Sequence, residues 1–352
     1  VRKDSLIIDY LDVDVVGGAA SQLSLAGIFQ KGGSVLFTAT WSSESGSSAL
    51  NDYLVVVSNM GEAAIFQGSF PSGPDWSYVG VYEISKPLGI NAWMKAGGDI
   101  AIATQRGIVP VSAARYKDPA ALSLDAISKN IEPDWVREAR ARNTLPYELA
   151  KWDAKGLFYV VMPAASSVDK PINFVFNLQT GAAAVYEGWQ MRCSAIHNDQ
   201  MYFGCDDGTV RLAEVSGYDL DQPYTVQVAY AWNHMGQPGN IKTVRQAKAD
   251  FITTYPFAVQ ISASTGYSIT FPTAPNVEAD VTPASLWDTG RYDEALWDAG
   301  TVSFPKSTRW QSVGMTGEIF AMQIQIPVGS VNTPDAELVI LQTTVEQGAL
   351  VT

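Results

Sequence analysis

The sequence predicts an all-β chain, in which β-propeller blades with a small helical insertion are followed by an antiparallel β-sandwich-like region. Three observations support this: Gly-containing hairpins recur along the first part, a helical pattern interrupts them at about 118–150, and longer alternating strands come later. We therefore predict propeller blades over residues 1–222 and a second β region over residues 223–352.

Four hairpins carry the prediction of repeated blades. In each, two apolar runs are joined by a short polar turn, in which glycine supplies the positive φ that other residues resist. A hairpin that recurs with varied sequence is typical of propeller blades. The four turns are residues 58–61, 104–107, 177–181 and 205–208.

Residues 118–150 break the strand pattern. Asp118-Pro119 is a favourable helix start, because proline is tolerated at the first helical position. A second helix is expected from Glu132 to about residue 142. Its basic face either docks a partner or is an ordinary solvated helix face. The basic residues are Arg137, Arg140 and Arg142.

A loop at residues 217–223 separates the two regions. Beyond it, Gln323 and Gln325 alternate with apolar residues, the period of two expected of a half-exposed antiparallel sheet. This pattern predicts a second β region that is built as a sandwich. The expected strands are residues 224–232, 243–254, 257–263, 320–326 and 337–345.

A Trp-rich loop is expected at residues 286–310, where the unit Leu-Trp-Asp-x-Gly occurs twice. Large rings in an irregular loop suggest that it anchors on a surface. The rings of Trp287, Trp297 and Trp310 either contact another subunit or cover the core edge of their own domain.

Composition limits the function classes. The net charge of −13 is the opposite of what a sequence-reading nucleic-acid protein carries, and an acidic wall would let DNA slide past without sticking. No apolar stretch reaches the roughly 18 residues that a membrane-spanning helix needs. The chain opens at Val1 without an initiator Met or signal peptide, which predicts a fragment or a processed product.

The sequence offers few candidate catalytic or metal-binding groups. Cys193, His197 and Cys205 match no zinc spacing, and buried structural thiols are the expectation for the two cysteines. No Gly-x-Ser-x-Gly elbow or phosphate-binding loop occurs. We therefore predict no enzyme, no cofactor and no metal. The carboxylate pairs lie in turns, where aspartate makes local hydrogen bonds; they are Asp206-Asp207, Asp219/Asp221 and Asp293/Glu294.

The densest basic stretch is residues 241–248. As a strand it would place Lys242 and Lys248 on one face and Arg245 on the other. A plain exposed strand is the simplest interpretation, and contact with an acidic neighbouring subunit is the alternative.

Several segments in the same order resemble the β-propeller tail proteins of short-tailed bacteriophages, of the tail hub, nozzle or packaged-DNA-stabilisation type. The resemblance spans most of residues 25–300, and the order of its motifs is more telling than any one of them. The segments are residues 61–68 with Pro71 and Trp76, 79–82 leading to 87–89, 97–112, 176–181, 203–210, 235–239 with Lys242, and the paired Leu-Trp-Asp units. Related chains are longer at the N-terminus, so upstream blades are expected to be missing.

The resemblance implies a structural virion protein of the phage tail that assembles with copies of itself, usually as a hexameric ring below the portal and adaptor. Such a ring extends the DNA channel, and viral DNA passes through it without sequence-specific binding. It holds the genome in until infection. The family carries over no catalytic residues.

Two other functions stay open. The first is a tail-associated carbohydrate-binding or depolymerase propeller, in which Trp and Tyr rings stack on sugars. The second is a secreted bacterial interaction propeller.

Overall fold

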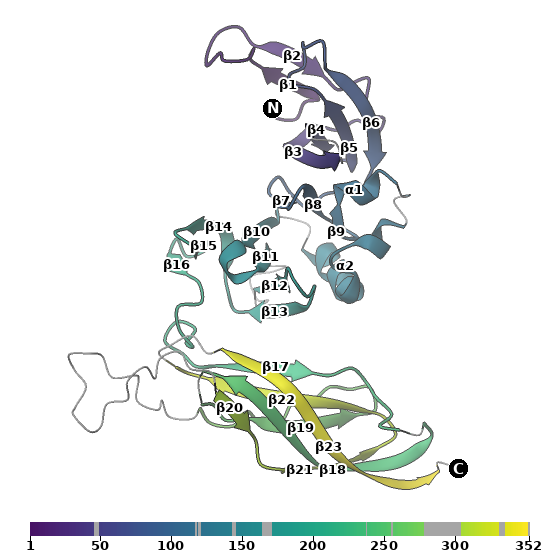
Figure 1. The fold of residues 1–352 in the computed structure, drawn as a ribbon, viewed down its shortest axis with the longest axis vertical. Helices are drawn as coiled ribbons and strands as arrows, with labels where there is room; N and C mark the ends of the chain where they lie inside the picture. The colour runs from purple at the N-terminus through teal and green to yellow at the C-terminus, as the bar shows by residue number, and fades with distance from the viewer. Residues whose placement is uncertain are drawn as a thin grey trace, which may run out of the picture. The chain divides into compact units, whose positions relative to one another are not determined.

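The computed structural model describes the chain in two compact units, Val1–Ala213 and Glu214–Thr352. The boundary lies a few residues before the expected loop at 217–223. Both units are built almost entirely from antiparallel strands, which confirms the all-β class (Figure 1). The described residues are 1–45, 49–116, 118, 121–142, 146–163, 171–236, 238–254, 256–277, 304–330 and 335–350.

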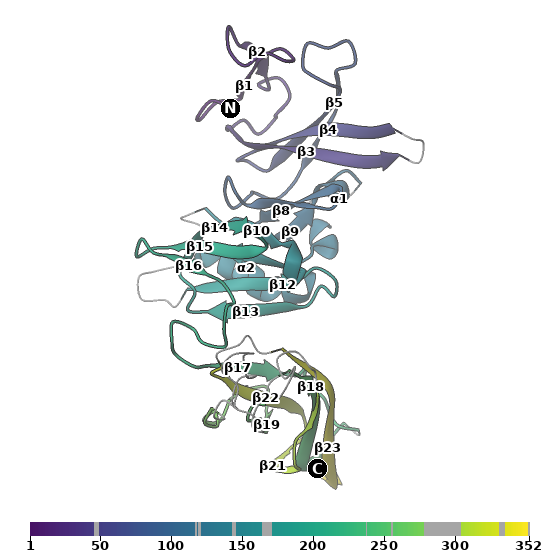
Figure 2. The same ribbon diagram turned by 60° about the vertical axis from the view of Figure 1, so that its left-hand side comes forward.

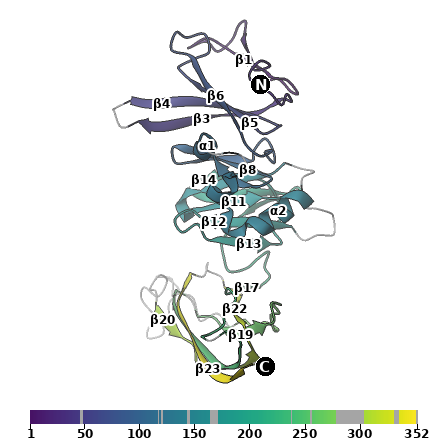
Figure 3. The ribbon, with the colours of Figure 1, turned by 90° about the vertical axis from the view of Figure 1, so that its right-hand side faces the viewer.

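The described part of the first unit contains five antiparallel sheets, each made from strands that follow one another in the chain. Figures 2 and 3 show the first four in chain order along the unit, whereas the fifth lies beside the fourth. The strands of the first two sheets are β1 (Ile7–Tyr10) and β2 (Ser21–Ser24), then β3 (Val35–Ser45), β4 (Ala49–Ser58), β5 (Glu62–Gln67) and β6 (Ser77–Glu83). The third sheet contains β7 (Trp93–Ala96), β8 (Asp99–Thr104) and β9 (Gly107–Pro110). The last two contain β10 (Glu148–Trp152), β11 (Leu157–Val161), β12 (Ile172–Asn177) and β13 (Ala183–Glu187), then β14 (Met191–His197), β15 (Gln200–Cys205) and β16 (Val210–Leu212).

The four predicted hairpins are confirmed as β4–β5, β8–β9, β12–β13 and β15–β16. The turn between β4 and β5 shows why glycine is needed there. Gly61 has a φ of 86°, and a Cβ atom at this position would lie 2.5 Å from the carbonyl oxygen of Ile84. The backbone just after β6 therefore fills the space that a side chain at Gly61 would need.

The middle sheets are buried on both faces. In β8, Ile100 and Ile102 pack into the core shared with the β3–β6 sheet. Ala101 and Ala103, which point the other way, pack into the core shared with the β10–β13 sheet. Consecutive sheets therefore stack face to face, and this two-sided burial explains why their strands are continuous apolar runs.

The first strands of three consecutive sheets are neighbours. Strand β10 contacts both β7 and β14. Asn91 forms an isolated parallel bridge with Glu148, whose carboxylate accepts a 2.9 Å hydrogen bond from the backbone N–H of Ser194. The fourth strands β6 and β13 have largely exposed or half-buried residues.

The helical segment differs from its prediction. Helical turns begin earlier than 118, at α1 (Val111–Ala114), and β10 has started by Glu148. The first predicted helix is a 3₁₀ turn, η1 (Leu122–Asp125), followed by η2 (Lys129–Ile131), and Pro119 lies outside the described residues. The insertion ends close to the expected residue 150, because residues 148–152 pair with β11.

The second predicted helix is confirmed as α2 (Glu132–Ala141), with a proline in its first turn. It packs into the core between the β7–β9 and β10–β13 sheets. Trp135 is buried there, and its indole Nε1 donates a 2.9 Å hydrogen bond to the carbonyl of Thr104. The insertion is therefore part of the unit's core.

The second unit has two sheets around one hydrophobic core, as in a β-sandwich. One sheet has the order β17 (Tyr224–Ala229), β22 (Phe320–Val328), β19 (Gln260–Thr265). In the other, the long β18 (Asn240–Thr253) pairs along one edge with β23 (Ala336–Leu350), and along the other with β21 (Gln311–Gly317) and β20 (Phe304–Ser307). Strands β20 and β21 were missed by the sequence analysis.

The expectation that Gln323 and Gln325 are half exposed was wrong. Both are buried, with 0% and 1% exposure. The amide of Gln323 accepts a hydrogen bond from Ser262 and donates one to Ser264, at 2.9 and 2.7 Å. The sheet is therefore covered on this face too, and the amide of Gln323 finds its hydrogen-bond partners within the sheet.

Candidate interaction surfaces

The exposed basic residues of α2 are Arg137 and Arg140. Arg137 forms ion pairs with Asp134, at 2.6 Å, and with Glu138. The hydrogen bond to Glu138, then that to Asp134, raises the pKa of Arg137. Its charge is therefore largely balanced on its own helix, whereas Arg140 is in no ion pair among the described residues.

Arg142 does not belong to this exposed face. It is buried, and its guanidinium bonds Glu138 at 2.8 Å and the carbonyl of Pro163 at 3.1 Å. It fixes the end of α2 to the segment after β11, so the basic surface is smaller than the sequence predicted.

Of the three tryptophans proposed as contacts, Trp310 is described and is 46% exposed. It lies between β20 and β21. Trp287 and Trp297 lie outside the described residues.

The carboxylates of the β15–β16 turn bind nearby groups. Asp206 pairs with Arg192. Asp207 accepts hydrogen bonds from the hydroxyl and backbone N–H of Thr209, at 2.6 and 2.9 Å, and from Arg211. The bonds from Thr209, more than the charge of Arg211, hold the pKa of Asp207 below its usual range. Both side chains stabilise the turn and its flanking strands.

Asp219 forms reciprocal backbone hydrogen bonds with Gln222, so it also lies in a tight turn. Asp293 and Glu294 lie outside the described residues.

The cysteines were predicted to be buried, and this holds for one of them. Cys205 is buried against the β10–β13 sheet, but Cys193 is exposed on the opposite face of its own sheet. Its Sγ atom lies over Gly204, the next strand's residue in register. Within the described ranges, no group of three or more His, Cys, Asp or Glu side chains could hold a metal ion.

The basic strand prediction for Lys242, Arg245 and Lys248 was partly wrong. Lys242 has 0% exposure, and its ammonium donates to the carbonyl of Asn240 at 2.8 Å and more weakly to that of Glu318. A register shift between Val244 and Gln246 adds a residue to β18, so Lys242 and Lys248 lie on opposite faces.

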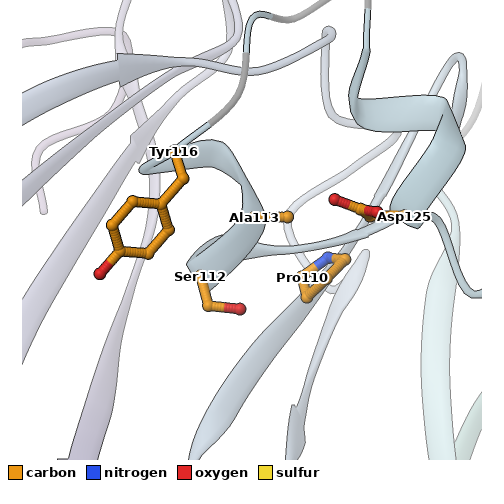
Figure 4. Close-up of a pocket in the computed structure, with 5 residues that line it drawn as sticks. All are labelled: Pro110, Ser112, Ala113, Tyr116 and Asp125. Carbon is orange, nitrogen blue, oxygen red and sulfur yellow. The ribbon is translucent and has the colours of Figure 1, made fainter.

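A shallow pocket of about 340 Å³ lies beside α1. Figure 4 shows the Asp125 carboxylate directed toward Ala113, whereas the Tyr116 ring lies across the helix and points away. The hydroxyl of Ser112 is already bonded to Asp99, at 2.5 Å. The polar groups around this pocket do not converge on one point, so its geometry supports no catalytic pair.

Strand β17 forms an apolar edge that the sequence analysis did not single out as a surface. Tyr224, Val226 and Val228 are each about 40% exposed, and Tyr230 just after the strand is 37% exposed. Within the described residues β17 pairs with β22 alone. The sequence shows an uncharged strand without proline here, but the pairing of the strands decides that it lies at a sheet edge.

Comparisons with known proteins identify no relative: no protein-family model matches the chain, and no curated protein sequence matches it significantly. None of the described helices has the length and apolar character needed to cross a membrane.

Proposed function

We propose that the chain is a structural virion protein of a bacteriophage tail, a hub or nozzle subunit that assembles as a ring around the DNA channel. The observation that carries the proposal is the stack of consecutive antiparallel sheets in the first unit, each buried on the faces that it shares with its neighbours. We interpret these sheets as propeller blades.

The contacts of the first strands support the blade interpretation. Blades around an axis must be close at their inner strands and apart at their outer strands. Strands β7, β10 and β14 are the first of their sheets, and β10 contacts both of the others, whereas the residues of the last strands β6 and β13 are exposed or half-buried. Sheets that are close at their first strands and apart at their last strands are tilted relative to one another, as blades around a common axis are.

The chemistry of the surface supports a passive wall. The carboxylates of the β15–β16 turn are bonded to their neighbours, and acidic residues outnumber basic ones along the chain, with a net charge of −13. Such a wall would repel a phosphate backbone and keep DNA mobile. The ordered motifs that resemble tail hub and nozzle proteins agree with this role in the virion.

The test is assembly of the full chain alone and with portal, adaptor and other tail proteins, followed by mass photometry and negative-stain imaging. We expect closed rings with a central channel, and six copies per ring. A monomer under every condition, with no binding to tail partners, would contradict the proposal.

The same purified protein can be used to test the alternative function, in which the chain binds or degrades a carbohydrate. Polysaccharide binding or degradation that is lost in Asp206→Ala or Asp207→Ala would favour a depolymerase or receptor-binding propeller. The tail-wall proposal expects both variants to be indistinguishable from the unmodified chain in such assays.

A further inference from the structure

The free edge of β17 has a sequence that is nearly symmetric about its centre. From residue 224 to residue 230 the order is Tyr-Thr-Val-Gln-Val-Ala-Tyr, which reads almost identically in both directions about Gln227. Two such strands, placed antiparallel with a two-fold axis at Gln227, bring each Tyr224 beside Tyr230 of the other copy. Each Val226 lies beside Val228 of the other copy. Aromatic and β-branched pairs of this kind stabilise antiparallel strands.

The backbone has the right phase for this pairing. The N–H of Tyr230 donates to the carbonyl of Met322 in β22, at 2.8 Å. Because successive residues of a strand direct their hydrogen-bonding groups to opposite edges, Val226 and Val228 also bond β22. Thr225, Gln227 and Ala229 therefore direct their N–H and C=O groups to the free edge. An axis at Gln227 pairs these same residues with one another.

The charge distribution favours a second copy as the occupant. No Asp, Glu, Lys or Arg occurs between Gln222 and Ile241, in a chain of net charge −13. Two copies with equal charge repel each other, so close approach costs least where the surface is neutral. Natural edge strands usually carry charge, proline or a bulge against pairing, and this one has none of these between Tyr224 and Ala229.

A row of glutamines points to the same axis. Gln227 lies in register with Gln325 of β22, which lies in register with Gln260 of β19. The buried Oε1 atoms of Gln325 and Gln260 have no hydrogen-bond partner in the described part of the chain. A second copy would extend the row across the axis, giving the Gln227 amides each other as partners.

We propose that β17 pairs antiparallel with β17 of a second copy about a two-fold axis at Gln227, which joins two three-stranded sheets into one continuous sheet. The contact goes beyond the proposed ring, because neighbours in a one-directional ring are not related by a two-fold axis. It holds a pair of subunits by a surface of the second unit alone.

The first test is cross-linking of the full chain in a Cys193→Ser background. Gln227→Cys places two sulfurs on the axis, where paired Cα atoms are about 5.5 Å apart, within the range for a disulfide. We expect a covalent dimer that a reducing agent separates. Thr225→Cys is the matched control, since it faces Ala229 of the other copy and should give little dimer. The double variant Thr225→Cys/Ala229→Cys should restore it.

The second test uses charge on the axis. Gln227→Lys and Gln227→Glu each face themselves in the pair, so each should weaken self-association about tenfold or more in sedimentation velocity. An equimolar mixture of the two should associate as a heterodimer at least as well as the unmodified chain. Because Gln227 is exposed, neither change disturbs the core.

Equal cross-linking by Gln227→Cys and Thr225→Cys, or no cross-link from either, would overturn the pairing. So would unchanged association of Gln227→Lys. Rings that still form in Gln227→Lys would leave the proposed function intact. Absence of rings in the unmodified chain, together with a cross-linked dimer in the Gln227→Cys variant, would contradict the proposed function and not this contact.

Discussion

At the scale of single residues, the structure depends on a few positions where the backbone conformation strongly favours glycine. Gly61 and Gly97 both have positive φ, 86° and 65°. They differ in their surroundings, because a Cβ atom at Gly61 would meet the carbonyl of Ile84, whereas nothing lies within 4 Å of one at Gly97. The turn after β4 is therefore fixed by packing as well as by conformation.

Gly61→Ala should lower the free energy of unfolding by about 3 kcal/mol or more, because left-handed strain adds to a backbone clash. Gly97→Ala carries the strain alone and should cost about 1 kcal/mol. Urea denaturation of both variants measures the difference. Equal losses would show that the contact with Ile84 plays no part.

The buried phenol of Tyr147 should make the stability of the fold depend on pH. It is buried, its hydroxyl donates a 3.3 Å hydrogen bond to the carbonyl of Glu138, and burial raises its pKa. A phenol whose pKa is raised in the folded state contributes stability that is fully present below the unfolded value of about 10 and is lost as the pH rises above it.

Tyr147→Phe should therefore reduce the loss of stability above about pH 10, and should change the stability at pH 7 by about 1 kcal/mol or less. Thermal unfolding between pH 7 and 11 tests this. Tyr116→Phe, at a side chain that is 78% exposed, is the control and should follow the unmodified chain. The prediction would be contradicted if Tyr147→Phe lost as much stability above about pH 10 as the unmodified chain does.

At the scale of elements, the short helix α2 contributes a large ring to the core between two sheets. Trp135 is 1% exposed and lies against Phe174 and Tyr147, with ring centroids 5.9 and 6.5 Å away. Trp310, which precedes β21, is 46% exposed. The two tryptophans should therefore respond differently to truncation.

Trp135→Ala should destabilise the chain by about 3–5 kcal/mol, through lost burial and an open cavity. Trp310→Ala should change the unfolding free energy by about 0.5 kcal/mol or less. If Trp310 is a subunit contact, the same variant should weaken assembly in mass photometry. A large loss of monomer stability in Trp310→Ala would instead favour a role in covering its own core.

At the scale of the whole molecule, the two compact units have separate hydrophobic cores. Phe158 stacks on Phe176 in the first unit, at a centroid distance of 4.7 Å, and both belong to the core beside α2. Phe320 is fully buried in the core of the second unit. Separate cores predict separate unfolding.

Calorimetry of the full chain should show two transitions. Phe158→Ala should lower the midpoint of one of them and Phe320→Ala that of the other, because each truncation should lower the unfolding free energy of its own unit by roughly 3–5 kcal/mol. A single transition that both substitutions shift equally would mean that the units unfold together.

Local patterns determined much of this fold. The four Gly-containing hairpins, the helix with proline in its first turn at Glu132–Ala141, and the long strands after residue 223 follow from spacing and turn chemistry, which act between near neighbours. The near-symmetric run around Gln227 can also be read from the sequence, although its position at a sheet edge cannot.

Tertiary structure decided what depends on distant partners. The register shift at Arg245 decides that Lys242 and Lys248 lie on opposite faces of β18, and it occurs in the pairing with both β21 and β23, which lie far along the chain. The burial of Gln323 and the strand that ends the helical insertion at Glu148 have the same origin. A sequence specifies such features through contacts whose partners are known only once the strands are paired, because periodicity reports which residues share a face and not what covers it.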